Sequence, residues 1–226
     1  MRSLLTALFL LFSHAPLPAQ VAPSESELRA YSGLHAAAAR GDVAEIERRI
    51  AAGDNKNATD SRGRTPLHVA AFQKKHEAAR TLLRFGADPN KQETDRYDII
   101  TIASVANDVP MLKIALEGRG NPRAITSRYD GTALIAAAHL GHAEVVRTLI
   151  AAGAPLDHVN NLGWTALIES IVLGDGGKNH TDTLSALVKA GANVNIGDRA
   201  GATPLQLARG RGYSAMVRIL TEAGGR

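Results

Sequence analysis

The residues best suited to chemistry lie in a glycine-rich run, Gly-Asp-Gly-Gly-Lys, at residues 174–178. A phosphate-binding loop would need a preceding strand and a Ser or Thr after the lysine, where this chain has Asn179. A calcium loop would need alternating acids, which the run lacks. The interpretation we favour is a lengthened turn between two helices. Contact with a partner through Asp175, Lys178 and His180 is one alternative, and ligand or metal chemistry is another.

Other chemical groups are scattered rather than clustered in sequence. His139 and His142 are three residues apart and could share a helix face, but no third ligand is evident, so we predict no metal site. The absence of Cys excludes thiol catalysis, thiolate metal sites and disulfides. No Ser or Thr lies in a recognisable nucleophile motif, and Glu45 and Glu47 fall on a predicted solvated helix surface. The chain is therefore predicted to be non-catalytic and to use no cofactor.

The composition favours a folded chain with a core of small side chains. Hydrophobic residues make up 45% of the 226 residues and aromatic residues only 4%, with Ala and Leu prominent. Such a core suits thin helices that pack closely. The formal charge of +4 is spread by alternating signs, except for Arg199, Arg209, Arg211 and Arg218 near the end. We interpret these arginines as a solvated end face, with contact to an anionic partner as the alternative, and predict no nucleic-acid partner.

The first nineteen residues have the order of a secretory signal peptide. A short positive start is followed by an apolar run at residues 4–12 and a region with Pro16 and Pro18. The predicted cleavage site follows Ala19, because Pro23 disfavours cleavage after Ala22. An uncleaved anchor is the alternative. We expect a flexible linker over residues 20–30, no later membrane segment, and a periplasmic or secreted mature protein that is monomeric.

Internal repetition accounts for most of the remaining chain. The sequence Thr-Pro-Leu-His-Val-Ala-Ala opens at Thr65, and related stretches open at Asp98, Thr132, Thr165 and Thr203, with a further copy around Leu34. The spacings are 33, 34, 33 and 38 residues. A glycine precedes each of these five opening positions by twelve residues, at Gly53, Gly86, Gly120, Gly153 and Gly191. Each unit therefore predicts helix, turn, helix, a glycine stop in the left-handed conformation, and an extended polar connection.

These residues resemble the ankyrin-repeat family, whose signature is T-P-L-H-x-A at a period of 33. The resemblance implies an all-α solenoid of about six helix-turn-helix units with short β-hairpin-like fingers, and histidines such as His35 and His68 that tie neighbouring turns together. A short bacterial-looking leader before such units is similar to exported, periplasmic ankyrin-repeat proteins. The predicted domain covers residues 31–226, with units at 31–59, 60–92, 93–126, 127–159, 160–197 and 198–226.

Two units depart from the pattern. The third has Asp98 and Ile99 in place of Thr-Pro, and Pro110 early in its second helix, which we expect to start late or be distorted. The fifth carries five extra residues within residues 173–182. Arginines near both ends of the solenoid give the polar caps that an open-ended stack needs.

Residues that do not define the repeat are free to form a binding surface. The positions just before each opening residue are predicted to be finger tips, where rigid aromatic residues and arginines are suited to anchor an interface. The ends of the inner helices should add to the same surface. The predicted partner-contacting residues are Arg62, Arg64, Tyr97, Arg128, Tyr129, Leu162 and Trp164 on the fingers, and Phe72, His139 and Leu173 at helix ends.

The predicted function is thus an exported, non-catalytic module that binds a protein partner through its concave surface of fingers and inner helices. An exported enzyme that the module supports or restrains is one candidate partner. Two alternatives stay open. One is a secreted factor that engages a host molecule, and the other is a small-ligand binder or enzyme that uses the glycine-rich insertion.

Overall fold

The computed structural model describes residues 20–226, in which the regular structure is almost entirely helical. The predicted signal peptide, residues 1–19, lies outside the described residues. The elements are α1 (Glu25–Ala30), α2 (Gly33–Arg40), α3 (Val43–Ala51), α4 (Pro66–Phe72), α5 (His76–Arg84), α6 (Ile99–Val105), α7 (Val109–Glu117), β1 (Ile125–Thr126), β2 (Gly131–Thr132), α8 (Ala133–His139), α9 (Ala143–Ala151), α10 (Ala166–Val172), α11 (Lys178–Lys189), α12 (Pro204–Gly210) and α13 (Ser214–Glu222).

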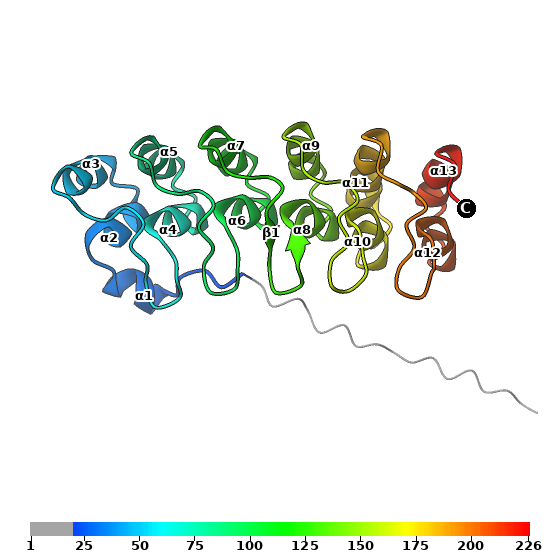
Figure 1. Cartoon of the computed structure of the whole chain (residues 1–226), viewed down its shortest axis with the longest axis horizontal. Helices are drawn as coiled ribbons and strands as arrows, with labels where there is room; N and C mark the ends of the chain where they lie inside the picture. Colours follow the sequence, from blue (N-terminus) through cyan, green and yellow to red (C-terminus); the bar gives the residue numbers. More distant parts are fainter. Residues whose placement is uncertain (1–19) are drawn as a thin grey trace, which may run out of the picture.

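The helices form two parallel rows that run from the N-terminal to the C-terminal end of the molecule (Figure 1). The inner row holds α2, α4, α6, α8, α10 and α12, and the outer row holds α3, α5, α7, α9, α11 and α13. Each helix packs against its partner in the same unit and against its counterparts in neighbouring units. The predicted all-α solenoid of six helix pairs is confirmed.

Inner helices begin where the opening residue supplies a side-chain cap. The hydroxyls of Thr65, Thr132, Thr165 and Thr203 accept the backbone N–H three residues further on, and the Asp98 carboxylate does the same in the third unit. Capping satisfies an N–H group that has no partner inside the helix. Asp98 therefore caps its helix in the same way as the threonines of the other units.

The second helix of the third unit is regular, so the expected late start or distortion at Pro110 is wrong. Helix α7 begins at Val109, with Pro110 in its first turn, and the Asp108 side chain accepts the N–H of Met111 at 3.0 Å. Proline is tolerated in the first helical turn because its missing N–H would have no helical partner there.

A residue in the left-handed conformation follows each outer helix that precedes a finger, and in all but one case it is the predicted glycine. Gly53, Gly86, Gly153 and Gly191 all have φ between +80° and +93°, but Gly120 does not adopt positive φ. In that unit Arg119 takes the left-handed position, with φ of +69°. The extra residue of this 34-residue unit lies after the helix stop.

Small side chains let the helices approach closely, as the composition predicts. Alanine pairs such as Ala70–Ala71 and Ala137–Ala138 are buried in the inner row, and Leu67, Leu82, Leu134 and Leu149 are fully buried in the same core. The core is one continuous cluster that extends from α2 to α13. No described helix is both long enough and apolar enough to cross a bilayer.

Residues 25–30 differ from the expected flexible linker, because they form helix α1. Ser24 and Glu27 make a capping box at its start, with Ser24 N–H donating to the Glu27 carboxylate at 2.7 Å. Glu27 and Tyr31 then bond to residues of the second unit. This segment is part of the N-terminal end of the stack.

Candidate functional site

The five fingers between units share one local design. We define each finger as the five residues from its first polar residue to the one before the cap, at residues 60–64, 93–97, 127–131, 160–164 and 198–202. The first side chain accepts the backbone N–H groups two and four residues later. These first residues are Asp60, Glu93, Ser127, Asn160 and Asp198.

The side-chain acceptor closes each finger into a tight loop whose tip faces away from the helices (Figure 1). In four fingers the first residue also donates its own N–H to the carbonyl of the fifth, as Asp60 does to Arg64 at 3.0 Å. Only around the remaining finger does the ladder in the described residues extend to a strand pair, with Ile125 opposite Thr132 and Thr126 opposite Gly131. The predicted β-hairpin-like fingers are confirmed in this form.

Neighbouring fingers are bonded to one another along the row. The N–H of Thr94 donates to the carbonyl of Arg62 at 2.9 Å, and the N–H of Asn161 donates to the carbonyl of Tyr129 at 2.9 Å. The guanidinium of Arg199 reaches back to the carbonyl of Asn161. These bonds hold the tips in register and make the row a preformed surface.

Arg64 is buried, so its predicted contact with a partner is wrong. Its side chain is fully buried and donates to the Asp60 carboxylate at 2.7 Å and the Glu27 carboxylate at 2.5 Å. Tyr31 donates its hydroxyl to the same Asp60 at 2.6 Å. Burial works to raise the pKa of Asp60, but the hydrogen bonds from Tyr31 and Arg64 outweigh it and lower that pKa. Arg64 holds the stack together from inside.

Tyr97 is also buried, at 9% exposure, which contradicts its predicted place on the surface. It occupies the same position of its finger as Arg64, directly before the capping residue. The carbonyl of Tyr97 lies 3.2 Å from the Nε2 of His68 in the preceding unit. The turn reverses the chain before this last finger residue, and the returning segment packs against the stack.

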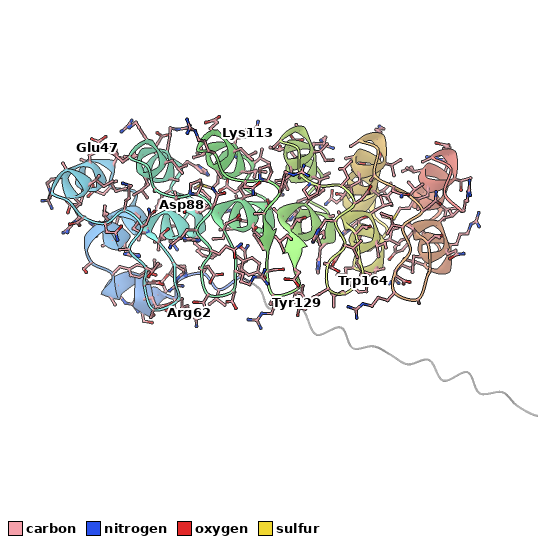
Figure 2. The ribbon with its side chains drawn as sticks, in the orientation of Figure 1. Glu47, Arg62, Asp88, Lys113, Tyr129 and Trp164 are labelled. Atoms are coloured by element: carbon pink, nitrogen blue, oxygen red, sulfur yellow. The ribbon has the colours of Figure 1, made fainter. Side chains whose placement is uncertain are left out.

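Five of the predicted finger residues lie where a partner can reach them. Arg62 and Arg128 are exposed, and Tyr129, Leu162 and Trp164 are half-buried. Arg62, Tyr129 and Trp164 lie along the finger edge, on the opposite side from Glu47 and Lys113 of the outer helices (Figure 2). Arg128 pairs with Asp95 of the neighbouring finger at 2.5 Å.

The inner-helix ends continue this surface with apolar side chains. Phe72 and Leu173 are half-buried, and Leu140, beside the predicted His139, is 39% exposed. Together with the finger residues they combine aromatic, aliphatic and arginine side chains, which is the composition of a protein interface.

The His139 side chain is partly buried beside a carboxylate rather than presented freely. Its Nδ1 lies 3.3 Å from the Oε2 of Glu169, a carboxylate on α10 that is 2% exposed. The other oxygen of Glu169 accepts from the side chain of Asn160 at 3.0 Å. Asn160 closes its finger, so its hydrogen bond to Glu169 connects α10 to the loop that carries Leu162 and Trp164.

The insertion of the fifth unit is an ordered part of the fold. It adds a turn to the outer helix, since α11 has twelve residues where α9 has nine. Asp175 lies 2.8 Å from the Nδ1 of His180, and Lys178 pairs with Asp182 at 2.5 Å. The favoured interpretation as a lengthened turn was thus incomplete, because part of the inserted sequence is helical.

Residues of the fourth and sixth units contact the insertion from both sides. The Nε2 of His180 lies 3.0 Å from the carbonyl of His139 in the fourth unit, and Tyr213 of the last unit donates its hydroxyl to the carbonyl of Gly174 at 2.8 Å. The Tyr213 ring covers Gly176 so closely that a Cβ there would lie 2.4 Å from it. The His180 side chain is engaged between units, whereas the Asp175 carboxylate that pairs with it is 76% exposed.

The described residues contain no group of three or more His, Asp or Glu side chains arranged to hold a metal ion. The histidines at the repeat position act between units, as the resemblance implies: the Nε2 of His35 lies 2.9 Å from the carbonyl of Arg64, and His68 meets Tyr97. A hollow of about 450 Å³ lies between α5 and α7, lined partly by Leu83, Ile114 and Arg119, and contains no residue of the insertion.

Comparison with known proteins decides the family. The family model described as ankyrin repeats matches residues 7–93 and 99–198. The chain belongs to the ankyrin-repeat family. Ankyrin repeats generally mediate protein–protein interaction and are typically non-catalytic, which agrees with the coarse functional prediction from sequence.

Bacterial ankyrin-repeat proteins are among the relatives. The protein YahD of Escherichia coli is 32% identical over 189 residues, which cover 83% of this chain and 94% of YahD. The crystal structure of an ankyrin repeat domain from Acinetobacter baumannii has a TM-score of 0.82 and 42% identity, and the match covers 85% of this chain and 98% of that domain. The ankyrin repeat protein EF0377 has a TM-score of 0.79 and 29% identity, with 85% and 98% covered.

Proposed function

We propose that this ankyrin-repeat protein is exported and binds one protein partner through its fingers and inner-helix ends. The observation that carries the proposal is the contrast between the finger backbone and its tip side chains. Side-chain acceptors and inter-finger bonds fix the backbone, while Tyr129, Leu162 and Trp164 keep part of their surface exposed. A preformed surface loses little conformational entropy on binding.

The outer helices are a poorer candidate for the same role. Their charged side chains pair with one another across neighbouring units, as Arg84 does with Glu47 at 2.7 Å and Arg80 does with Glu117 at 3.3 Å. Ion pairs between exposed side chains contribute little to affinity and leave few apolar anchors. The finger side is therefore the surface to test.

A capture experiment tests the binding surface. The wild-type protein, residues 20–226, is immobilised and exposed to periplasmic extract alongside the double variant Tyr129→Ala, Trp164→Ala. We expect one or a few proteins to bind the wild type and to be lost from that variant. The matched control Glu47→Ala, Lys113→Ala, on the outer helices, should retain them. Equal capture by all three proteins would contradict the proposed surface.

Export is proposed from the sequence of residues 1–19, with cleavage after Ala19. Expression of the full chain in a Gram-negative cell, fractionation and N-terminal sequencing provide the test. We expect a periplasmic protein that begins at Gln20. Recovery of the uncleaved chain from the cytoplasm would contradict export, and recovery from the medium would favour the secreted factor over a periplasmic module. The nature of the partner as an exported enzyme is part of the same proposal, and identification of the captured protein decides it.

A further inference from the structure

We propose that the last unit, residues 198–226, binds an acidic segment of the protein partner through Arg199, Arg209 and Arg211. This inference rests on the proposed function and names the chemistry of one part of its partner. We call these three side chains the basic end.

The excess positive charge of the chain is concentrated in this unit. Residues 3–197 contain twenty basic and twenty acidic residues, whereas residues 198–226 contain five arginines and two acids. One of those two acids, Asp198, is the acceptor that closes its own finger. The local field of the last unit is therefore positive while the rest of the stack is neutral.

The arginines of the last unit also differ from the others in their partners. Eleven of the thirteen arginines between residues 20 and 197 lie within 4.0 Å of a carboxylate oxygen. In the described residues no arginine after residue 197 has such a carboxylate, and Arg199, Arg209 and Arg211 are all exposed. Unpaired guanidinium groups can take a carboxylate bidentately.

The N-terminal end of the same stack is an internal comparison. There Arg29 pairs with Glu25, Arg40 lies 4.0 Å from Asp42, and Arg48 pairs with Glu45. A polar cap needs charge for solubility, but balanced charge satisfies that need. The C-terminal end carries arginines without the balancing acids. A role in solubility does not require this excess of positive charge.

Two of the three arginines are already held in place. The guanidinium of Arg211 donates to the carbonyl of Val172 at 2.9 Å, and Arg199 donates to the carbonyl of Asn161. Each bond fixes the side chain but leaves its charge unpaired, so part of the ordering cost of binding is met in the free protein.

The position of the basic end indicates a protein rather than a nucleic acid. Arg199 belongs to the finger row and bonds to the finger that carries Leu162 and Trp164. Because the stack before this unit is neutral, it offers no continuous basic track for a phosphate backbone. A partner with an apolar stretch followed by acids fits both parts.

Binding to a fluorescein-labelled peptide of ten glutamates tests the inference directly, with residues 20–226 titrated at 50 and 150 mM salt. We expect measurable affinity at 50 mM that weakens at 150 mM. Arg199→Gln, Arg209→Gln, Arg211→Gln should weaken it at least tenfold. The control Arg80→Gln, Arg84→Gln, Arg147→Gln removes the same charge from the outer helices and should weaken it less than threefold. Circular dichroism verifies that both variants are folded.

Three results would overturn the inference: no binding of the glutamate peptide by the wild type, equal weakening by the two triple variants, or tighter binding of a single-stranded DNA of ten nucleotides. The capture experiment on Tyr129 and Trp164 is scored separately. Loss of the inference therefore leaves the proposed finger surface standing, and loss of the finger surface leaves the peptide result interpretable.

Discussion

At the scale of single residues, Arg64 shows that the position of a residue in the repeat does not determine whether its side chain faces solvent or the core. It precedes the capping Thr65 and lies in a finger, but its guanidinium points into the stack between Asp60 and Glu27. Trp164 has the same place in its own finger and is half-buried. The orientation of the residue before the cap depends on partners outside its own repeat, such as Glu27 for Arg64. The sequence of one repeat does not show them.

Replacement of Arg64 by Met should destabilise the protein by about 3 kcal/mol, because it leaves the nearly buried Asp60 carboxylate and the partly exposed Glu27 carboxylate without their shared cation. Urea denaturation followed by circular dichroism measures the change. The control Arg62→Met removes an exposed arginine whose nearest carboxylate oxygen is 3.8 Å away and should cost less than about 0.5 kcal/mol. Similar losses for the two variants would argue against a structural role for Arg64.

His68 should make stability depend on pH in the acid range. Burial lowers the pKa of His68 to about 4, and Thr65 N–H donates to its Nδ1 at 3.1 Å, which requires that nitrogen to be unprotonated. Above pH 6.5 the folded and unfolded states are both neutral here, so the full stability is present. Between pH 6.5 and 4 the unfolded chain binds a proton that the folded protein excludes, so stability falls as the pH falls.

The comparison of wild type with His68→Gln isolates this effect from that of other groups. From pH 7.5 to 4.5, the free energy of unfolding of the wild type should fall by about 2 kcal/mol more than that of the variant. Urea denaturation at four pH values measures the difference. Parallel curves would show that His68 titrates in the folded protein much as it does in the unfolded chain.

At the scale of elements, the sequence predicts the helix pairs, the caps and most of the glycine stops, because each depends on a few neighbouring residues. Its failures are also local. Pro110 looked disruptive until its place in the first turn of α7 was known, and Gly120 was one residue from the true helix stop at Arg119. An insertion of one residue shifts a glycine out of register without altering the fold.

The finger closures were missed although the sequence contains a signal for them. Five residues before each opening position stands a side chain with an acceptor oxygen. The residue type changes from unit to unit, so a search for identical letters does not detect it. The buried position of Tyr97 and the approach of His139 to Glu169 could not be predicted, since they depend on residues from different units.

Two glycines of the C-terminal part separate backbone strain from packing. Gly176 and Gly212 have φ of +71° and +72°, but a Cβ on Gly176 would meet the Tyr213 ring while one on Gly212 would meet open space. Gly212→Ala should cost about 1 kcal/mol from strain alone. Gly176→Ala should cost about 1–3 kcal/mol more, because the ring must move. Thermal unfolding of both variants decides whether the insertion is packed as described.

At the scale of the whole molecule, the stack begins earlier than the repeat pattern indicates. Helix α1 is six residues long and carries no copy of the repeat, yet it supplies Glu27 to the buried Arg64. The predicted domain boundary at residue 31 divides this network.

A protein that begins at residue 31 should therefore be less stable than one that begins at residue 20, by about 2–4 kcal/mol. Differential scanning calorimetry of the two proteins measures the change. Glu27→Gln in the longer protein should reproduce a large share of the loss. Equal melting temperatures of the long and short proteins would place the true domain start at residue 31.

The closed fingers have a consequence for how such a protein can acquire a new specificity. In each finger the bonds that hold the loop involve the first side chain and backbone groups, so the second and third side chains, such as Asn161 and Leu162, contribute nothing to closure itself. Those two positions can therefore be changed without opening the loop, and the change acts instead on the bonds between fingers, which side chains such as Asn161 and Arg199 make. The side chains at the finger tips can thus vary while the closed loop backbone stays the same.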